Sequence, residues 1–132
     1  MTLPVNHPID EQTFSCSTNS IASTPLAAVL RVMYRGQVTR LGAVSHGAFT
    51  TDCSIAVAII TPVASGTAPG SGTAISGSPM TLGATSSAAG TSTSMVPSAF
   101  TVVNEGDMIV FTPSGSTGTT IGATFSAAIV AI

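Results

Sequence analysis

The segment that most constrains the fold is 100–132, which contains three apolar runs of strand length. Two stretches rich in Gly, Asn, Asp, Pro and Ser, at 104–107 and 113–118, separate the runs. Runs rich in Val, Ile, Phe and Thr between such residues are typical of successive antiparallel strands. In the last run, alternate apolar residues share one face of a strand. These residues are Ile121, Ala123, Phe125, Ala127, Ile129 and Ala131. We therefore expect an all-β fold, an antiparallel β-sandwich of jelly-roll type.

The sequence predicts an extended N-terminal arm, residues 1–24, followed by a single β-sandwich domain, residues 25–132. A chain of 132 residues can build one two-sheet core but not two. Residues 1–24 show no sustained period of 2 or 3.6, so we expect this arm to become ordered only against a partner; a frayed tail is an equally good interpretation.

The segment 25–35 is predicted to be a strand with one core face and one face that meets a partner. Its alternate residues Ala28, Leu30, Val32 and Tyr34 form one set, and Val29, Arg31, Met33 and Arg35 form the other. A helix from Pro25 to Arg35 is the alternative, because Leu and Ala also favour helix.

The segment Cys53–Ile60 is predicted to be a strand that is buried on both faces, because both sets of its alternate residues are mainly apolar. A turn is expected at Gly42–Gly47 and a short strand at 79–82. The segments 63–77 and 83–97, rich in Ser, Thr, Ala and Gly, are expected to be loops, the first interrupted briefly at 73–75.

Charged residues make up only 6% of the chain, against about 25% in a typical soluble protein. With 18 serines and 20 threonines, the surface must consist mostly of hydroxyls, glycine and small apolar groups. Such a surface loses its water at low cost because no ion is desolvated. We therefore expect a protein that functions in an assembly.

The basic residues are the candidate partner contacts. Arg31, Arg35 and Arg40 are the only Arg or Lys residues in the chain, and we expect them to pair with carboxylates of a neighbouring copy or of a protein lattice. Pairing within the chain with Asp52, Glu105 or Asp107 is an equally good interpretation. Three arginines are too few to bind nucleic acid by charge neutralisation.

The sequence predicts no enzyme, cofactor or metal site. A chain without Lys has neither a Walker-type phosphate loop nor a Schiff-base lysine. His46 beside Asp52, with Cys53 or Ser45 as nucleophile, is conceivable but not favoured. Asp107 follows Gly106 at the start of a strand, where Asp commonly hydrogen-bonds its own turn.

Cellular location is expected to be cytoplasmic during synthesis. The first eight residues lack the basic start and apolar core of a signal peptide. The apolar stretch Ile55–Ile60 is far shorter than the roughly 20 residues of a transmembrane helix. Cys16 and Cys53 are therefore expected to be reduced thiols.

Four segments together resemble head-decoration, or cement, proteins of tailed bacteriophages. These segments are Gly47–Ile60, Gly72–Leu82, Ser87–Gly90 and Val103–Val110, followed by the closing apolar strand. The resemblance implies a jelly-roll-like sandwich, usually a homotrimer, on the exterior of the capsid. It also implies that the protein bridges major capsid proteins and stabilises the head by binding alone.

Two other functions use the same scaffold. A tail-fibre or receptor-binding tip would recognise a host glycan, but the chain has no Trp and only one Tyr, Tyr34, to stack on a sugar. A metal-dependent enzyme of the cupin type would need several histidines, and the chain has two.

Overall fold

The computed structural model describes residues 11–63, 65–66, 72–99, 101–118 and 120–132, in which ten β-strands and no helix occur. The strands are β1 (Glu11–Thr18), β2 (Ala28–Arg31), β3 (Gly36–Ser45), β4 (Cys53–Ile60), β5 (Thr73–Ala74), β6 (Met80–Leu82), β7 (Ser92–Met95), β8 (Thr101–Val103), β9 (Met108–Ser114) and β10 (Ala123–Ala131).

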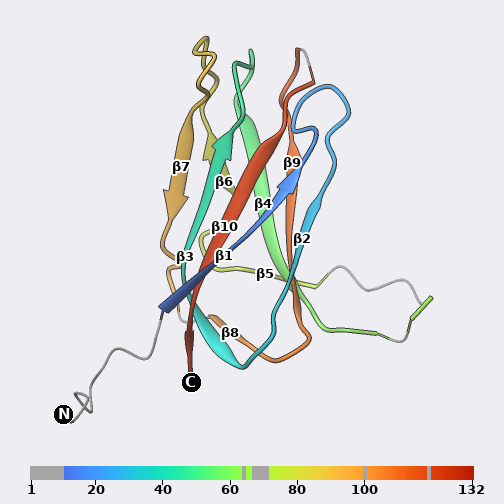
Figure 1. Cartoon of the computed structure of the whole chain (residues 1–132), viewed down its shortest axis with the longest axis vertical. Helices are drawn as coiled ribbons and strands as arrows, with labels where there is room; N and C mark the ends of the chain where they lie inside the picture. The colour runs from blue at the N-terminus through green and yellow to red at the C-terminus, as the bar shows by residue number, and fades with distance from the viewer. Residues whose placement is uncertain (1–10, 64, 67–71, 100, 119) are drawn as a thin grey trace, which may run out of the picture.

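The strands form two antiparallel sheets that pack face to face (Figure 1). One sheet has the order β1-β10-β3-β7, and β8 also pairs with β3. The other has the order β2-β9-β4-β5, and β6 also pairs with β4. The pairing is nested along the chain, because β1 pairs with β10 and β2 pairs with β9. Nested pairs that are rolled into two sheets make a jelly roll, so the predicted fold class is confirmed.

The core lies between the two sheets. Phe111 of β9 and Phe125 of β10 are fully buried and stack across the sheets, with ring centroids 5.0 Å apart. Toward the C-terminal end of β10, Tyr34 packs against Phe14 and donates a hydrogen bond of 3.2 Å to the carbonyl oxygen of Ile129. The aromatic residues therefore join the two sheets as well as filling the core.

The alternation predicted for the last strand and for 25–35 is confirmed. Ala123, Phe125, Ala127 and Ile129 are buried. In 25–35, Ala28 and Val32 are buried while Val29, Arg31, Met33 and Arg35 are exposed. The segment 25–35 is therefore strand-like rather than helical, although only Ala28–Arg31 makes ladder pairs.

The predicted arm needs correction at residues 11–18. These residues form β1, which pairs along its whole length with β10 at the edge of a sheet. On the inward side β1 carries Phe14, Cys16 and Thr18, of which only Phe14 is a large apolar residue. The apolar alternation was therefore too weak to reveal the strand. Residues 1–10 lie outside the described residues.

Parts of two segments that were predicted as a turn and a loop are strands. Gly42 lies inside β3, where a side chain on residue 42 would come within 2.8 Å of Ser126 Oγ on the neighbouring strand. The predicted loop 83–97 contains β7, which pairs with β3 through its backbone although its sequence is Ser-Thr-Ser-Met. In both places backbone pairing outweighs the weak apolar pattern of the sequence.

The prediction that both faces of β4 are buried is wrong within this chain. Cys53, Ile55 and Val57 are fully buried, but Ala56 is exposed and Ala58 and Ile60 are only partly covered. The outer face of β4 is mainly apolar, and among the described residues no second layer covers it.

Four connecting segments gather at one end of the sandwich, the upper end in Figure 1. They join β1 to β2, β3 to β4, β6 to β7 and β9 to β10. Hydrogen bonds hold them together: Ile21 N donates to Ile121 O at 2.8 Å, and Thr50 Oγ1 donates to Thr117 O at 2.8 Å. We call this the loop end.

Candidate functional site

The three arginines lie on separate surfaces. Arg31 is exposed on β2, opposite Met108 of β9. Arg40 is exposed on β3, opposite Ala128 of β10 and therefore on the other sheet. Arg35 lies in the turn between β2 and β3, where its carbonyl oxygen accepts a hydrogen bond of 3.2 Å from Ile132 N. The structure therefore brings together no basic cluster, and any partner contacts of the three residues belong to different surfaces.

Two of the acidic residues considered as partners of the arginines stabilise backbone instead. Asp107 is buried and its Oδ2 accepts a hydrogen bond of 2.9 Å from Asn104 N. Asp107 therefore caps its own turn, as its position after Gly106 predicts. Asp52 Oδ1 accepts a hydrogen bond of 2.8 Å from Ala84 N, which ties the β3–β4 segment to the β6–β7 segment.

The residues considered for a catalytic triad are not joined to one another by the hydrogen bonds of the structure. His46 Nε2 lies 2.8 Å from Thr124 Oγ1. Ser45 Oγ is bonded to Gly47 O and Thr91 N, and Cys53 Sγ lies 3.8 Å from Ile21 O. Each side chain therefore has a structural partner of its own.

The outer side of the β1-β10-β3-β7 sheet is rich in hydroxyls, and we call it the hydroxyl face. Its members are Thr13, Ser15, Ser17, Gly42, Val44, Ser92, Ser94, Thr124 and Ser126. Ser15, Ser126, Gly42 and Ser94 lie directly opposite one another on four successive strands. Because these side chains are short and uncharged, the face is flat and its dehydration removes no ion from water.

The outer side of the β2-β9-β4-β5 sheet carries an apolar patch, which we call the apolar face; Arg31, Ser54, Thr112 and Ser114 lie beside it on the same side. Its members are Val29, Ala56, Ala58, Ile60, Ala74, Met108 and Val110. Val29, Val110, Ala58 and Ala74 make one row across the four strands, and Met108 and Ile60 are neighbours in the next row. Half of the Val29 side chain (51%) is exposed.

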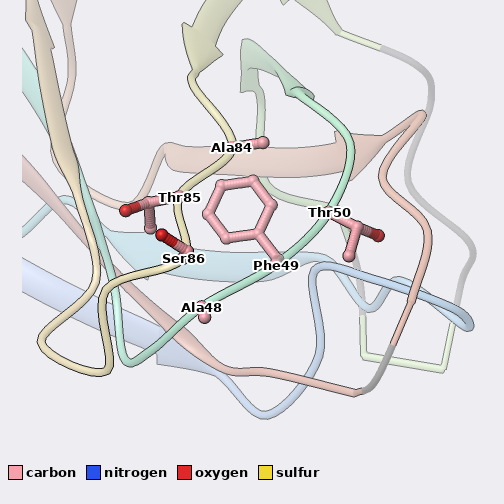
Figure 2. A pocket seen from close by; sticks show the side chains of 6 residues that line it. All are labelled: Ala48, Phe49, Thr50, Ala84, Thr85 and Ser86. Carbon is pink, nitrogen blue, oxygen red and sulfur yellow. The ribbon is translucent and has the colours of Figure 1, made fainter.

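A shallow hollow at the loop end lies between Ala48–Thr50 and Ala84–Ser86, with a volume of about 550 Å³. The two segments are joined by a pair of hydrogen bonds between Phe49 and Thr85, of 3.0 and 3.2 Å. Figure 2 shows the Phe49 ring turned toward Ala84 and Thr85. The ring is nearly buried and the lining has no ionisable side chain, so the hollow offers few groups for recognising a charged ligand.

In the described part of the chain, no group of three or more His, Cys, Asp or Glu residues is placed to hold a metal ion. The described residues also contain no helix with the length and apolar character needed to cross a bilayer.

The two cysteines are unbridged and lie in the core. Cys53 is fully buried and Cys16 is partly covered. Burial raises the pKa of both thiols above the ordinary value, and for Cys53 a backbone hydrogen bond at Ser114 offsets part of this effect. Both groups are therefore held as neutral thiols.

Thiol labelling should show this burial. At pH 8 we expect Cys53 to remain unmodified by iodoacetamide in the folded protein and to react at once in urea, because the thiolate is the reactive form. Cys16→Ser isolates the signal of Cys53. Rapid labelling of Cys53 without denaturant would contradict its place in the core.

The raised pKa values also predict how stability varies with pH. Above roughly pH 8.5 the thiols of the unfolded chain lose protons while those of the folded chain still hold them. The free energy of unfolding should therefore be level below that pH and fall as the pH rises further. Urea denaturation from pH 7 to 10 measures the slope, and Cys53→Ala should reduce it.

Sequence reasoning identified the arginines but missed both outer faces as surfaces. The hydroxyl face draws on β1 and β7, which the sequence placed in an arm and a loop. The apolar face draws on outward residues of β4 that the sequence placed in the core. The signal that could have found the second face is the row of small apolar residues in alternate positions of 28–31, 53–60 and 108–114.

Comparisons with known proteins find no relative. No protein-family model matches the chain, and neither the curated proteins nor the solved structures include a match.

Proposed function

We propose that this chain is a structural protein of a bacteriophage virion, a decoration protein that binds the outer surface of the head and bridges major capsid proteins. The single observation that carries the proposal is the flat hydroxyl face, nine uncharged positions on four strands, with the charged residues Arg40 and Glu11 farther along the same side of the sheet. Such a face can be buried against protein over its whole area at low dehydration cost. The resemblance of the sequence to cement proteins supplies the partner.

The jelly-roll scaffold supports this proposal in a second way. Ser45, His46, Asp52 and Cys53 are engaged in structural hydrogen bonds, so the residue types that carry chemistry serve the fold. We therefore assign the function to contacts made by the protein surface. The contact with the head is then made by many small groups rather than by a few charged anchors.

Binding to heads tests the proposal directly. The gene for this chain is deleted from the phage that carries it, and heads are prepared from the deletion mutant. The purified chain is then added back to these heads. We expect the chain to sediment with the heads and to raise the temperature at which they release DNA. Ser15→Arg, in the middle of the edge strand β1 of the hydroxyl face, should weaken binding at least tenfold because it places a charge in the contact.

Ser114→Arg is the matched control, because Ser114 is an exposed serine on the outer side of the opposite sheet. It should bind heads as the unaltered chain does. If the unaltered chain neither binds nor stabilises heads, and gold-labelled antibody marks the tail instead, the decoration function is wrong and the tail-tip alternative takes its place.

A further inference from the structure

We infer that a second hollow, at the end of the sandwich opposite the loop end, binds a guanidinium group with the carboxylate of Asp107 as its counter-ion. This site goes beyond the proposed function and does not depend on what the hydroxyl face binds. The hollow is lined by residues of both sheets, has a volume of about 420 Å³ and is open to solvent. Its walls come from β4, β5, β8 and the turn before β9, and β8 lies at this end of the sandwich in Figure 1.

Asp107 directly precedes β9 and belongs to the inward set of alternate residues. The next members of that set, Ile109 and Phe111, are fully buried between the sheets, and only 7% of Asp107 itself is exposed. Arg31 lies opposite Met108, on the outer side of the same sheet, so it faces away from the hollow. Because a buried carboxylate is costly unless its charge is compensated, a cation that enters the hollow removes this cost.

One oxygen of the Asp107 carboxylate is available to a ligand. Oδ2 accepts the hydrogen bond of 2.9 Å from Asn104 N, and among the described residues no donor bonds to Oδ1. Asp107 lines the hollow, so Oδ1 can accept a hydrogen bond from a molecule placed there. The turn therefore holds the carboxylate in position without neutralising it, and a group that is already ordered adds little entropic cost to binding.

The wall contributed by the other sheet offers a second acceptor. Thr101 of β8 lies opposite Val38, which is buried in the core, so the Thr101 side chain also points between the sheets. Its hydroxyl donates a hydrogen bond of 3.3 Å to Ala99 O, which leaves the lone pairs of the hydroxyl oxygen free to accept. Ile59 and Val102 add apolar surface to the same hollow.

A guanidinium group matches these acceptors. It is planar and permanently charged, with several N–H donors and no acceptor, so it can meet a carboxylate and a hydroxyl together. A hard metal ion would require about six oxygen ligands, and the hollow has one carboxylate. Its volume is near the lower end of the range for ligand pockets, about 300–1,000 Å³. The group therefore comes from an arginine side chain of a partner protein or from a small free molecule.

NMR titration of the full-length chain tests this site. The probes are butylguanidinium, a capped peptide with one arginine between two glycines, and the neutral analogue butanol, all at equal ionic strength. We expect both guanidinium compounds to shift the amide signals of Thr73, Thr101 and Asp107 with millimolar dissociation constants, and butanol to bind at least tenfold more weakly. Tighter binding of the peptide would indicate an arginine of a partner protein, and tighter binding of butylguanidinium a free molecule.

Asp107→Asn should weaken the binding of butylguanidinium at least tenfold. The amide oxygen of asparagine can still accept the hydrogen bond from Asn104 N, while the negative charge is lost. Asp52→Asn is the matched control, because Asp52 also accepts a backbone hydrogen bond, from Ala84 N, but at the loop end and outside the hollow. It should leave the dissociation constant unchanged. Thermal unfolding confirms that both variants are folded.

Three results would overturn the inference: no shift with either guanidinium compound, butanol binding as tightly as butylguanidinium, or Asp107→Asn binding no more weakly than Asp52→Asn. If Asp107→Asn does not fold, Thr101→Leu replaces it, because leucine occupies the hollow from the other sheet and leaves the Asp107 turn intact. It should weaken binding at least fivefold. None of these measurements uses heads, so their outcome does not bear on the decoration function.

Discussion

Phe111→Ala is expected to lower the free energy of unfolding by about 3–5 kcal/mol. Phe111 is fully buried and its ring lies nearly parallel to that of Phe125, with an angle of 5° between their planes. The two residues belong to different sheets, so the substitution leaves a cavity between the layers and also removes an aromatic contact of about 0.5–1.5 kcal/mol. Because a whole domain has about 5–15 kcal/mol of stability, the loss is a large fraction of the total.

Urea denaturation followed by circular dichroism measures this loss. Phe111→Leu retains most of the buried volume and should cost clearly less than Phe111→Ala. Thr112→Ala, at the next and exposed position of β9, should change stability by less than about 1 kcal/mol. A loss below about 1 kcal/mol for Phe111→Ala would show that the two rings do not hold the sheets together.

Gly90→Ala is expected to destabilise the fold by at least about 2 kcal/mol more than Gly115→Ala. Both glycines have a positive φ, 82° for Gly90 and 84° for Gly115, so both substitutions add the same backbone strain. A Cβ atom at residue 90 would come within 2.7 Å of Ser45 Oγ and closer still to the Ser45 carbonyl oxygen. At residue 115 the nearest atom, Asp52 O, is 3.8 Å away.

The difference between the two variants isolates the junction between β3 and the β6–β7 segment. Ser45 is buried there, and its backbone N–H donates a hydrogen bond of 2.8 Å to Thr91 O while its hydroxyl accepts one of 2.9 Å from Thr91 N. Thermal unfolding of both variants under one set of conditions makes the comparison. Equal unfolding temperatures for the two variants would mean that the junction shifts at little cost to make room for the added Cβ atom. Glycine would then be required at residue 90 only for its positive φ.

The elements that were predicted correctly are those whose alternation is strong. In β10 and β4 one set of alternate residues is wholly apolar, and burial of that set follows directly from the period of a strand. Asp107 was predicted because the geometry of its turn is local. These features depend on residues close together in the sequence.

The elements that were missed depend on partners far away in the sequence. Ser and Thr make up half of β1 and three of the four residues of β7, and these segments become strands because their backbones pair with β10 and β3. No local sequence pattern reveals that a distant strand has unpaired backbone groups. The apolar face was misread for the same reason, since a strand with two apolar sides reads as fully buried whether or not a second layer of the same chain exists.

The sequence positions of the arginines also misled. Arg31, Arg35 and Arg40 lie within ten positions, which indicates a cluster. Between them the chain crosses from one sheet to the other, so Arg31 and Arg40 end on opposite sides of the sandwich. Residues that are close in sequence can lie far apart in the fold when the chain between them passes from one sheet to the other.

The nested pairing of the strands has a consequence for how the protein folds. Glu11 lies opposite Val130, so β1 cannot find its neighbour until the ribosome has made β10. A topology dominated by such distant contacts has a high contact order, which for all-β domains means folding in milliseconds to seconds. During synthesis the backbone groups of the early strands remain unpaired until the later strands are made. The scarcity of long apolar runs in β1 and β7 limits aggregation of these strands in that interval.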